Sequence, residues 1–163
     1  MKNTITIFLF FLIFSNLSAQ PSSFVSRESI FISTSIETIP YDFESFVIGG
    51  GMSFGYGTGA AVGMKLAWFF GLEGMNALEL NVFWKYFLSG LNADTGPFLQ
   101  LMLGPVIFNR MDEFSIGSNK GSMTYGLGFG WRFFIGDIWY VEPMVRSGYP
   151  YIISAGVSGG ARL

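Results

Sequence analysis

The chain has 163 residues, which is enough for one domain. Charged residues make up 12% of it and hydrophobic residues 50%, so a soluble surface would be short of charge, and part of the exterior is expected to face something other than water. The net charge of −2, without a long run of one sign, argues against nucleic-acid binding. Cysteine and histidine are absent, which removes thiol chemistry and the commonest general base and metal ligand. We therefore expect no enzyme, no cofactor and no metal site.

Residues 1–19 have the pattern of a secretory signal peptide. Lys2 precedes a ten-residue apolar stretch from Ile5 to Phe14, and Ala19 supplies a small residue ahead of a cut. A membrane-spanning anchor needs about 20 apolar residues, so this stretch is short for that role. We predict a signal peptide over residues 1–19 and a single mature domain over residues 20–163.

Large apolar side chains alternate with small or charged ones along most of the remaining chain. Between Phe46 and Tyr56 the even positions are mostly large and apolar, whereas the odd positions are mostly Gly and Ser. A helix would not keep a period of two, so the alternation predicts β-strands. It recurs in eight segments, which span residues 30–37, 46–56, 60–70, 78–86, 99–104, 125–133, 139–149 and 151–158.

Turn signals separate these segments at residues 41–42, 57–59, 71–74, 92–96, 109–122, 136–137 and 148–150. Short connections predict antiparallel neighbours, because parallel pairing needs long crossovers. Pro143 lies within one predicted strand and Pro105 late in another, and each lacks an N–H for the ladder, so we expect a bulge or a ladder break at Pro143.

The charged residues of the predicted strands lie opposite the large apolar side chains. Those assigned to the interior network are Lys65, Glu79, Lys85, Arg132, Glu142 and Arg146, and Arg162 near the end of the chain lies opposite the large apolar side chains as well. A Lys or Arg that faces lipid at mid-membrane costs roughly 2–4 kcal/mol, so these residues are expected to point inward and to pair. The set predicts an interior polar network that acts as a structural lock; the alternative is a conducting or gated polar path.

The size of the side chains favours a membrane barrel over a soluble one. An eight-stranded barrel is only just wide enough inside to be filled by side chains, so the bulky apolar set is expected outside, against lipid. Aromatic residues near the strand ends predict belts at the two membrane interfaces: Tyr56, Trp68, Trp84, Tyr86, Trp131, Trp139, Tyr149 and Tyr151. An even strand count places both termini in the periplasm, the long loop at residues 109–122 outside the cell and the two-residue turn Gly136-Asp137 in the periplasm.

The last third of the chain resembles a known family. The runs from Gly126 to Phe134, from Trp139 to Pro143 and from Arg146 to Pro150 are similar to small outer-membrane β-barrel proteins of spirochaetes. More broadly, the chain resembles the eight-stranded barrels of the OmpX, OmpW and OmpA type. The resemblance implies an all-β, up-and-down antiparallel transmembrane barrel in the bacterial outer membrane, with membrane lipid and the barrel-assembly machinery as partners. These families usually end in an aromatic residue, where this chain ends in Leu163.

Two functions follow from this interpretation. The first is an integral outer-membrane barrel with a structural role, or one that is porin-like and passes small, apolar molecules through its wall or narrow lumen. The alternative is a surface protein that binds a partner through the 109–122 loop. Gly126, Gly128 and Gly130 superficially resemble a phosphate-binding loop, but they lie within one alternating strand and are expected to be small inward residues. A Gly-rich helical inner-membrane protein is a further alternative.

Overall fold

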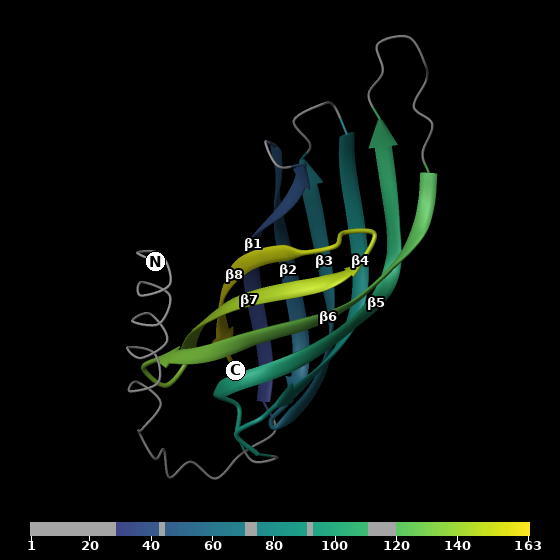
Figure 1. Ribbon diagram of the computed structural model, residues 1–163. Coiled ribbons are helices and arrows are strands. Elements are labelled where there is room, and N and C mark those ends of the chain that lie inside the picture. Colours follow the sequence, from purple (N-terminus) through teal and green to yellow (C-terminus); the bar gives the residue numbers. More distant parts are fainter. Residues whose placement is uncertain (1–28, 43–44, 71–74, 91–92, 111–119) are drawn as a thin grey trace, which may run out of the picture.

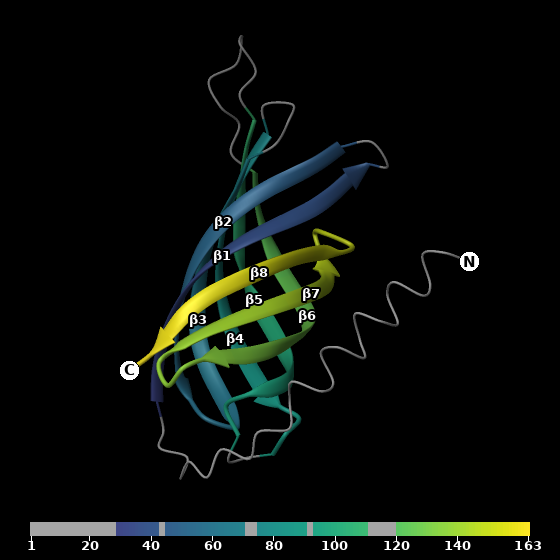
Figure 2. The ribbon, with the colours of Figure 1, turned by 90° about the vertical axis from the view of Figure 1, so that its left-hand side faces the viewer.

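The computed structural model describes residues 29–42, 45–70, 75–90, 93–110 and 120–163, which form one closed, all-antiparallel barrel (Figure 1). Each strand pairs with the next in sequence, and β8 closes the sheet against β1 (Figure 2). The eight strands are β1 (Ser29–Asp42), β2 (Ser45–Gly57), β3 (Ala60–Phe70), β4 (Met75–Phe87), β5 (Gly96–Arg110), β6 (Lys120–Ile135), β7 (Trp139–Tyr149) and β8 (Ser154–Arg162). The predicted fold class is confirmed. The predicted signal peptide lies outside the described residues.

The barrel has two different ends. We call the end that carries Ser29 and Arg162 the terminal end, and the opposite one the distal end. The terminal end carries the β2–β3, β4–β5 and β6–β7 connections, and the distal end carries the other connections between successive strands. At the terminal end, β6 and β7 are joined by three residues, Gly136 to Ile138, and Gly136 has a φ of 71° that only glycine adopts freely. The expected turn of two residues was one residue too short.

Most described strands extend beyond the predicted segments, and the predicted turn at residues 41–42 falls within β1; two further differences concern the loops at the distal end. Strand β5 continues to Arg110 and β6 starts at Lys120, so the predicted 109–122 loop is too long at both ends, and its centre at residues 111–119 lies outside the described residues. Strand β8 starts at Ser154, three residues later than predicted. Pro150 occupies the β7–β8 turn, and a residue without an N–H suits a turn better than a strand.

Pro143 and Pro105 each interrupt a ladder, as expected for Pro143. The β6–β7 pairing stops at Gly130 opposite Met144 and resumes in the same register at Phe133 opposite Val141. The β4–β5 pairing has a similar gap beside Pro105. The missing N–H of each proline is therefore accommodated by a local break on one side of the strand, without a shift of register.

The alternation predicted from the sequence separates the two faces of the wall. Large side chains such as Ile48, Leu66 and Leu101 are about half exposed on the outside, whereas the described charged side chains of the strands face the lumen. Among the described residues there is no helix long and apolar enough to cross a membrane. The described strands also contradict the helical alternative for this part of the chain.

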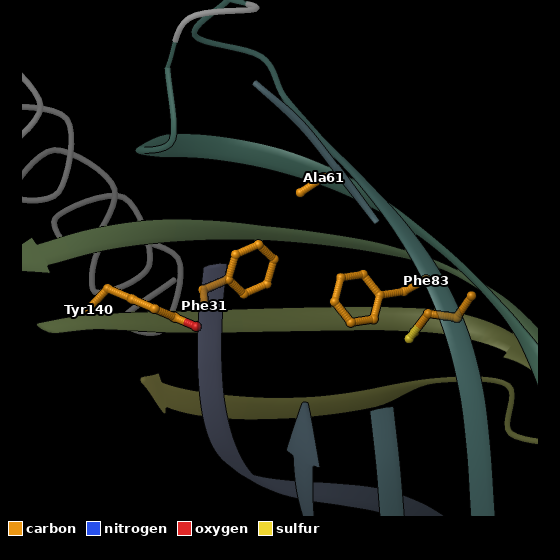
Figure 3. Close-up of a cluster of buried hydrophobic side chains, with 5 residues drawn as sticks. Phe31, Ala61, Phe83 and Tyr140 are labelled. Atoms are coloured by element: carbon orange, nitrogen blue, oxygen red, sulfur yellow. The ribbon is translucent and has the colours of Figure 1, made fainter. Parts of the chain in front are cut away.

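The lumen holds more large side chains than the size argument allowed. Two apolar clusters fill it. The terminal cluster consists of Phe31, Ala61, Phe83, Met102 and Tyr140 (Figure 3), and Phe134 packs against it. The distal cluster consists of Ile39, Ala67, Phe69, Ala77 and Val106, with Val47, Phe108 and Tyr151 packed against it. The expectation that bulky rings must all lie outside was therefore wrong.

Glycines make room for these rings. Gly55 lies directly opposite Phe31 in the ladder, and a Cβ at Gly55 would overlap the Phe31 ring. The same arrangement occurs at four more cross-strand pairs: Gly49 with Phe69, Gly63 with Phe83, Gly130 with Phe98 and Gly160 with Tyr140. Each ring covers an inward-facing glycine of the neighbouring strand, so a narrow lumen accepts large residues when small ones stand opposite them.

Candidate functional site

Ion pairs occupy the lumen among the apolar side chains, and they form two groups. The group nearer the terminal end is centred on Glu142 of β7. Lys85 of β4 donates to both carboxylate oxygens at 2.8 Å, and the Arg132 Nε of β6 donates to Oε1 at 2.6 Å. The Ser158 hydroxyl of β8 donates to Oε2 at 3.3 Å. The three ionic side chains are at most 6% exposed, so this group ties four strands together inside the barrel.

Aromatic rings surround the cations of this group. The Lys85 ammonium lies 4.3 Å from the centre of the Phe98 ring, and the Arg132 guanidinium lies 4.2 Å from the centre of the Tyr140 ring. Cations over aromatic faces are stabilised by the ring quadrupole, most strongly where water is excluded. The rings that fill the terminal half of the lumen therefore also solvate its buried charges.

The second group lies nearer the distal end and is centred on Arg146 of β7. Its guanidinium pairs with Glu79 of β4 at 3.1 Å and with Glu37 of β1 at 3.3 Å, and its Nε donates to the Ser154 hydroxyl at 2.8 Å. Glu37 also pairs with Lys65 of β3. Since β1, β3, β4, β7 and β8 all contribute, the group crosses the lumen from wall to wall.

All six interior residues predicted from the sequence face the lumen, and every one of them belongs to one of these two groups: Lys65, Glu79, Lys85, Arg132, Glu142 and Arg146. Glu37 was missing from the predicted network. The sequence did contain a signal for it, because Glu37 lies on the same face of its alternating segment as Ser33 and Ser35, opposite the large apolar side chains. A further pair that the network did not include joins Arg162 and Asp94 at 2.6 Å near the terminal end, where both side chains are partly exposed.

The two groups leave little open space between them. The gap has a volume of about 30 Å³ and is bordered by Ser33, Ser53, Lys65, Lys85 and Gln100, among others. A water molecule needs roughly 10–15 Å³ of such volume, so the gap has room for about two. The buried charges are four cations and three carboxylates, so the described lumen carries one excess positive charge.

Each buried carboxylate is held by a cation, and the described residues contain no cluster of acidic side chains that could hold a metal ion. What the lumen residues do chemically is bind one another across the barrel.

Seven of the eight aromatic residues predicted for the membrane interfaces are on the outward face. Near the terminal end these are Tyr56, Trp84, Tyr86, Trp131 and Trp139, and near the distal end they are Trp68 and Tyr149. Several of them stack on outward neighbours: the ring centre of Trp68 lies 5.5 Å from that of Phe70, and the ring centre of Tyr149 lies 5.7 Å from that of Tyr125. These positions are those that interface belts would require.

Tyr151 was placed wrongly. It lies in the β7–β8 turn rather than in a strand, and its ring packs 5.6 Å from the ring of Phe69 in the distal cluster. The alternation could not predict this orientation, because the turn ends the two-residue period before Tyr151.

Comparison with solved structures identifies the fold. The chain is similar to the N-terminal β-barrel domain of OprF from Pseudomonas aeruginosa, with a TM-score of 0.56, 13% identity, and coverage of 84% of this chain and 100% of that one. The fold is that of a small eight-stranded outer-membrane β-barrel. Neisserial surface protein A (NspA) is also similar, with a TM-score of 0.59, 11% identity, and coverage of 83% and 96%. So is the attachment invasion locus protein Ail of Yersinia pestis in complex with the heparin analogue sucrose octasulfate, with a TM-score of 0.54, 13% identity, and coverage of 83% and 97%.

No protein-family model matches the chain, and no curated protein matches it. The likeness to solved structures, at 11–13% identity, therefore concerns the fold alone.

Proposed function

We propose that this chain is an integral protein of the bacterial outer membrane with a structural role, and that its lumen is closed to ions and polar solutes. The apolar outward face supports the membrane location, because a closed barrel satisfies its backbone hydrogen bonds laterally and can expose such a face to lipid. The two ion-pair groups support the closed lumen, since they cross it from wall to wall and the two apolar clusters fill the space beside them.

The single observation that carries the closed lumen is the space left inside it. A gap of about 30 Å³ between the ion-pair groups holds about two waters and offers no continuous column of them. An ion that passed would have to separate buried pairs, which costs several kcal/mol per pair. This favours the structural lock over the conducting or gated path, and it argues against permeation of small apolar molecules along the full length of the lumen.

Planar bilayer recordings test this proposal. The purified, refolded barrel is expected to give no discrete conductance steps, while a large porin in the same bilayers provides the positive control. Insertion of the silent barrel is verified separately by its heat-modifiable migration on gels after recovery from the bilayer lipid. Reproducible unitary steps from the folded protein would contradict a closed lumen.

The cellular location is proposed together with export by a cleaved signal peptide and insertion by the barrel-assembly machinery. If residues 1–19 are removed, the protein recovered from the outer-membrane fraction starts at Gln20, which intact-mass measurement detects. A tag placed near Ser118 is expected to be labelled on intact cells, and a tag in the β6–β7 turn is not. Labelling of the tag in the β6–β7 turn alone would show that the barrel has the opposite orientation in the membrane.

Partner binding at the distal end is a second candidate. Strands β5 and β6, at 15 and 16 residues, are the longest of the eight, and they extend beyond the β7–β8 hairpin at the distal end (Figure 1). One solved structure with this fold, that of Ail, contains a heparin analogue. Binding of sucrose octasulfate to the purified barrel, measured by calorimetry before and after deletion of residues 111–119, tests it. Binding that survives the deletion would place the contact elsewhere.

A further inference from the structure

A large cavity lies at the distal end, beyond the second ion-pair group. Its volume is about 320 Å³, and its inner walls come from the distal cluster: Ile39, Val47, Phe69, Ala77, Phe108 and Tyr151. An apolar cavity of about 150 Å³ stays dry and binds benzene, so this one has room for an apolar molecule about twice that size. Volumes of about 300 Å³ and more are typical of ligand sites.

The floor of the cavity separates it from the charges below. Phe69 and Tyr151 both line the cavity, and their rings pack against each other at 5.6 Å. On their other side lies Arg146, whose guanidinium is 5.6 Å from each ring centre. The cavity is thus an apolar compartment that ends at the ion-pair group and does not continue through the lumen.

The wall beside the cavity is incomplete at the level of the β7–β8 hairpin. The last pair between β1 and β8 is Thr38 opposite Ala155, and the last pair between β6 and β7 is Tyr125 opposite Tyr149. Beyond these pairs β1 is paired only with β2, and β6 only with β5. Figure 1 shows that β7 and β8 turn back below the ends of β1 and β6, and we call the unpaired stretch between β1 and β6 beyond this hairpin the notch.

Three cavity residues lie at this notch: Pro40 on β1, and Pro150 and Ile152 in the β7–β8 turn. Ile152 is 87% exposed, more than any other large apolar side chain described. Pro40 has no N–H, so it leaves no donor unpaired where β1 lacks β8 as a partner. The cavity therefore reaches the outer surface of the wall sideways, through an edge made of apolar side chains.

The outer surface around the notch is apolar. On β1 and β2, Ile36, Ile48 and Phe46 are each more than half exposed and continue up to the level of Pro40, which pairs with Phe46. On the other side, Met123 and Tyr125 of β6 are similarly exposed. An outward surface of this kind belongs in lipid, so the notch opens toward the membrane rather than toward water.

We propose that the cavity binds one acyl chain, or an apolar molecule of similar size, that enters sideways from the membrane through the notch. Among the described lining residues, only Asn76 and the Tyr151 hydroxyl offer side-chain hydrogen-bonding groups, so a polar ligand would find few partners in this part of the cavity. An apolar chain, in contrast, buries its surface against Phe69, Ala77 and Phe108. The proposal rests on the proposed membrane location and goes beyond the structural role.

Photo-crosslinking in lipid nanodiscs tests the site. One arm uses a free fatty acid that carries a diazirine at the end of its chain, and the other uses a phospholipid with the same group in one acyl chain. Crosslinked positions are mapped by mass spectrometry. Crosslinks to Phe69, Ala77 or Phe108 are expected in addition to those on lipid-facing residues such as Ile48. If both probes reach the cavity, membrane lipid is a source of the chain, and if only the fatty acid does, the ligand is a free molecule.

Cavity-filling variants provide the control. Ala77→Phe is expected to lower the cavity crosslinks roughly tenfold or more, while crosslinks at Ile48 stay unchanged. Ala60→Phe, an outward substitution on β3 at the terminal end, is the matched variant and is expected to leave both sets unchanged. If Ala77→Phe does not fold by the gel-shift criterion, Val47→Phe replaces it, since Val47 also lines the cavity.

Two outcomes would overturn the proposal, and they differ from each other. Crosslinks confined to outward-facing residues, identical in the wild type and in the filled variant, would show that the cavity takes no chain. Absence of crosslinks even at Ile48 would contradict the membrane location itself. Neither outcome depends on conductance, so the closed lumen is tested independently.

Discussion

Removal of the Glu142 carboxylate is the most informative single change in the lumen. This carboxylate accepts hydrogen bonds from Lys85, Arg132 and Ser158, and its side chain is 6% exposed. In Glu142→Ala, Lys85 and Arg132 keep their burial but lose their counter-charge. The excess of buried positive charge rises from one to two, because Glu37 and Glu79 remain engaged with Lys65 and Arg146.

The expected loss of stability is set by the stranded cations. Loss of one partner from a buried pair costs about 3–5 kcal/mol, chiefly because the other charge stays buried without compensation. With a urea dependence of about 2 kcal/mol/M, the unfolding midpoint should fall by about 1.5–2.5 M. Urea titration in detergent micelles, followed by the gel shift between folded and unfolded barrel, measures this midpoint.

Two companion variants separate charge from packing. Gln100→Ala removes a buried, uncharged side chain that faces the same gap and is expected to shift the midpoint by less than half as much. Glu142→Gln combined with Lys85→Met removes one charge of each sign and should recover part of the loss seen in Glu142→Ala. A midpoint for Glu142→Ala equal to that of Gln100→Ala, or a double variant less stable than Glu142→Ala, would refute a charge-based lock.

Three more comparisons test the remaining features of the barrel by urea titration, the second of them in lipid bilayers instead of micelles. Gly55→Val should lower the free energy of unfolding by about 1–3 kcal/mol, because a side chain there overlaps the Phe31 ring. Adding Phe31→Ala to the same chain should restore part of that stability. If the two substitutions instead lower stability additively, the ring–glycine contact is refuted. Leu66→Arg, at the middle of the outward face of β3, should lower the free energy of unfolding by about 2–4 kcal/mol in a bilayer. Ala60→Arg, at the terminal end of the same face, should lower it by about 1 kcal/mol or less. Equal losses would mean that lipid does not cover this face. Arg162→Ala breaks the partly exposed pair with Asp94 and should lower the free energy of unfolding by about 1 kcal/mol or less. A loss as large as that of Glu142→Ala would show that this pair is as desolvated as the ion pairs of Glu142.

The strand architecture was predictable because the charges report the inner face directly. Within β4, Glu79 and Lys85 share a parity, and within β7, Glu142 and Arg146 share one, so each strand independently marks its lumen side. A charge in the wrong register would face lipid, and that cost fixes the register. The identity of the partners was not predictable, because it depends on how the strands stagger around the barrel. The pairing of Arg146 with Glu37, for example, joins residues that are 109 positions apart.

The strand ends were less predictable than the strands. The alternation continues through Val106 and Phe108, yet Asn109 and Asp112 suggested an early turn, so the loop was predicted too long. Tyr151 shows the same limit at another place. An aromatic residue next to a turn has no parity to follow, and here the distal cavity and the Phe69 ring determine its inward orientation. Short turns are set by tertiary contacts that a local pattern does not contain.

The rings in the lumen show that size is a weaker criterion than charge for the inside of a small barrel. Phe31, Phe69, Phe83, Phe98 and Tyr140 could face inward because a glycine stands opposite each of them. Lipid imposes no penalty on an apolar ring that faces it, and a filled lumen imposes none on the same ring if space is provided, so an aromatic residue alone does not reveal its side. A charged residue does, because only the lumen offers it a partner. Once the charges have assigned the inner face of each strand, the inward glycines predict where the neighbouring strand places a ring. Such ring–glycine pairs, rather than small residues alone, fill the volume of the lumen.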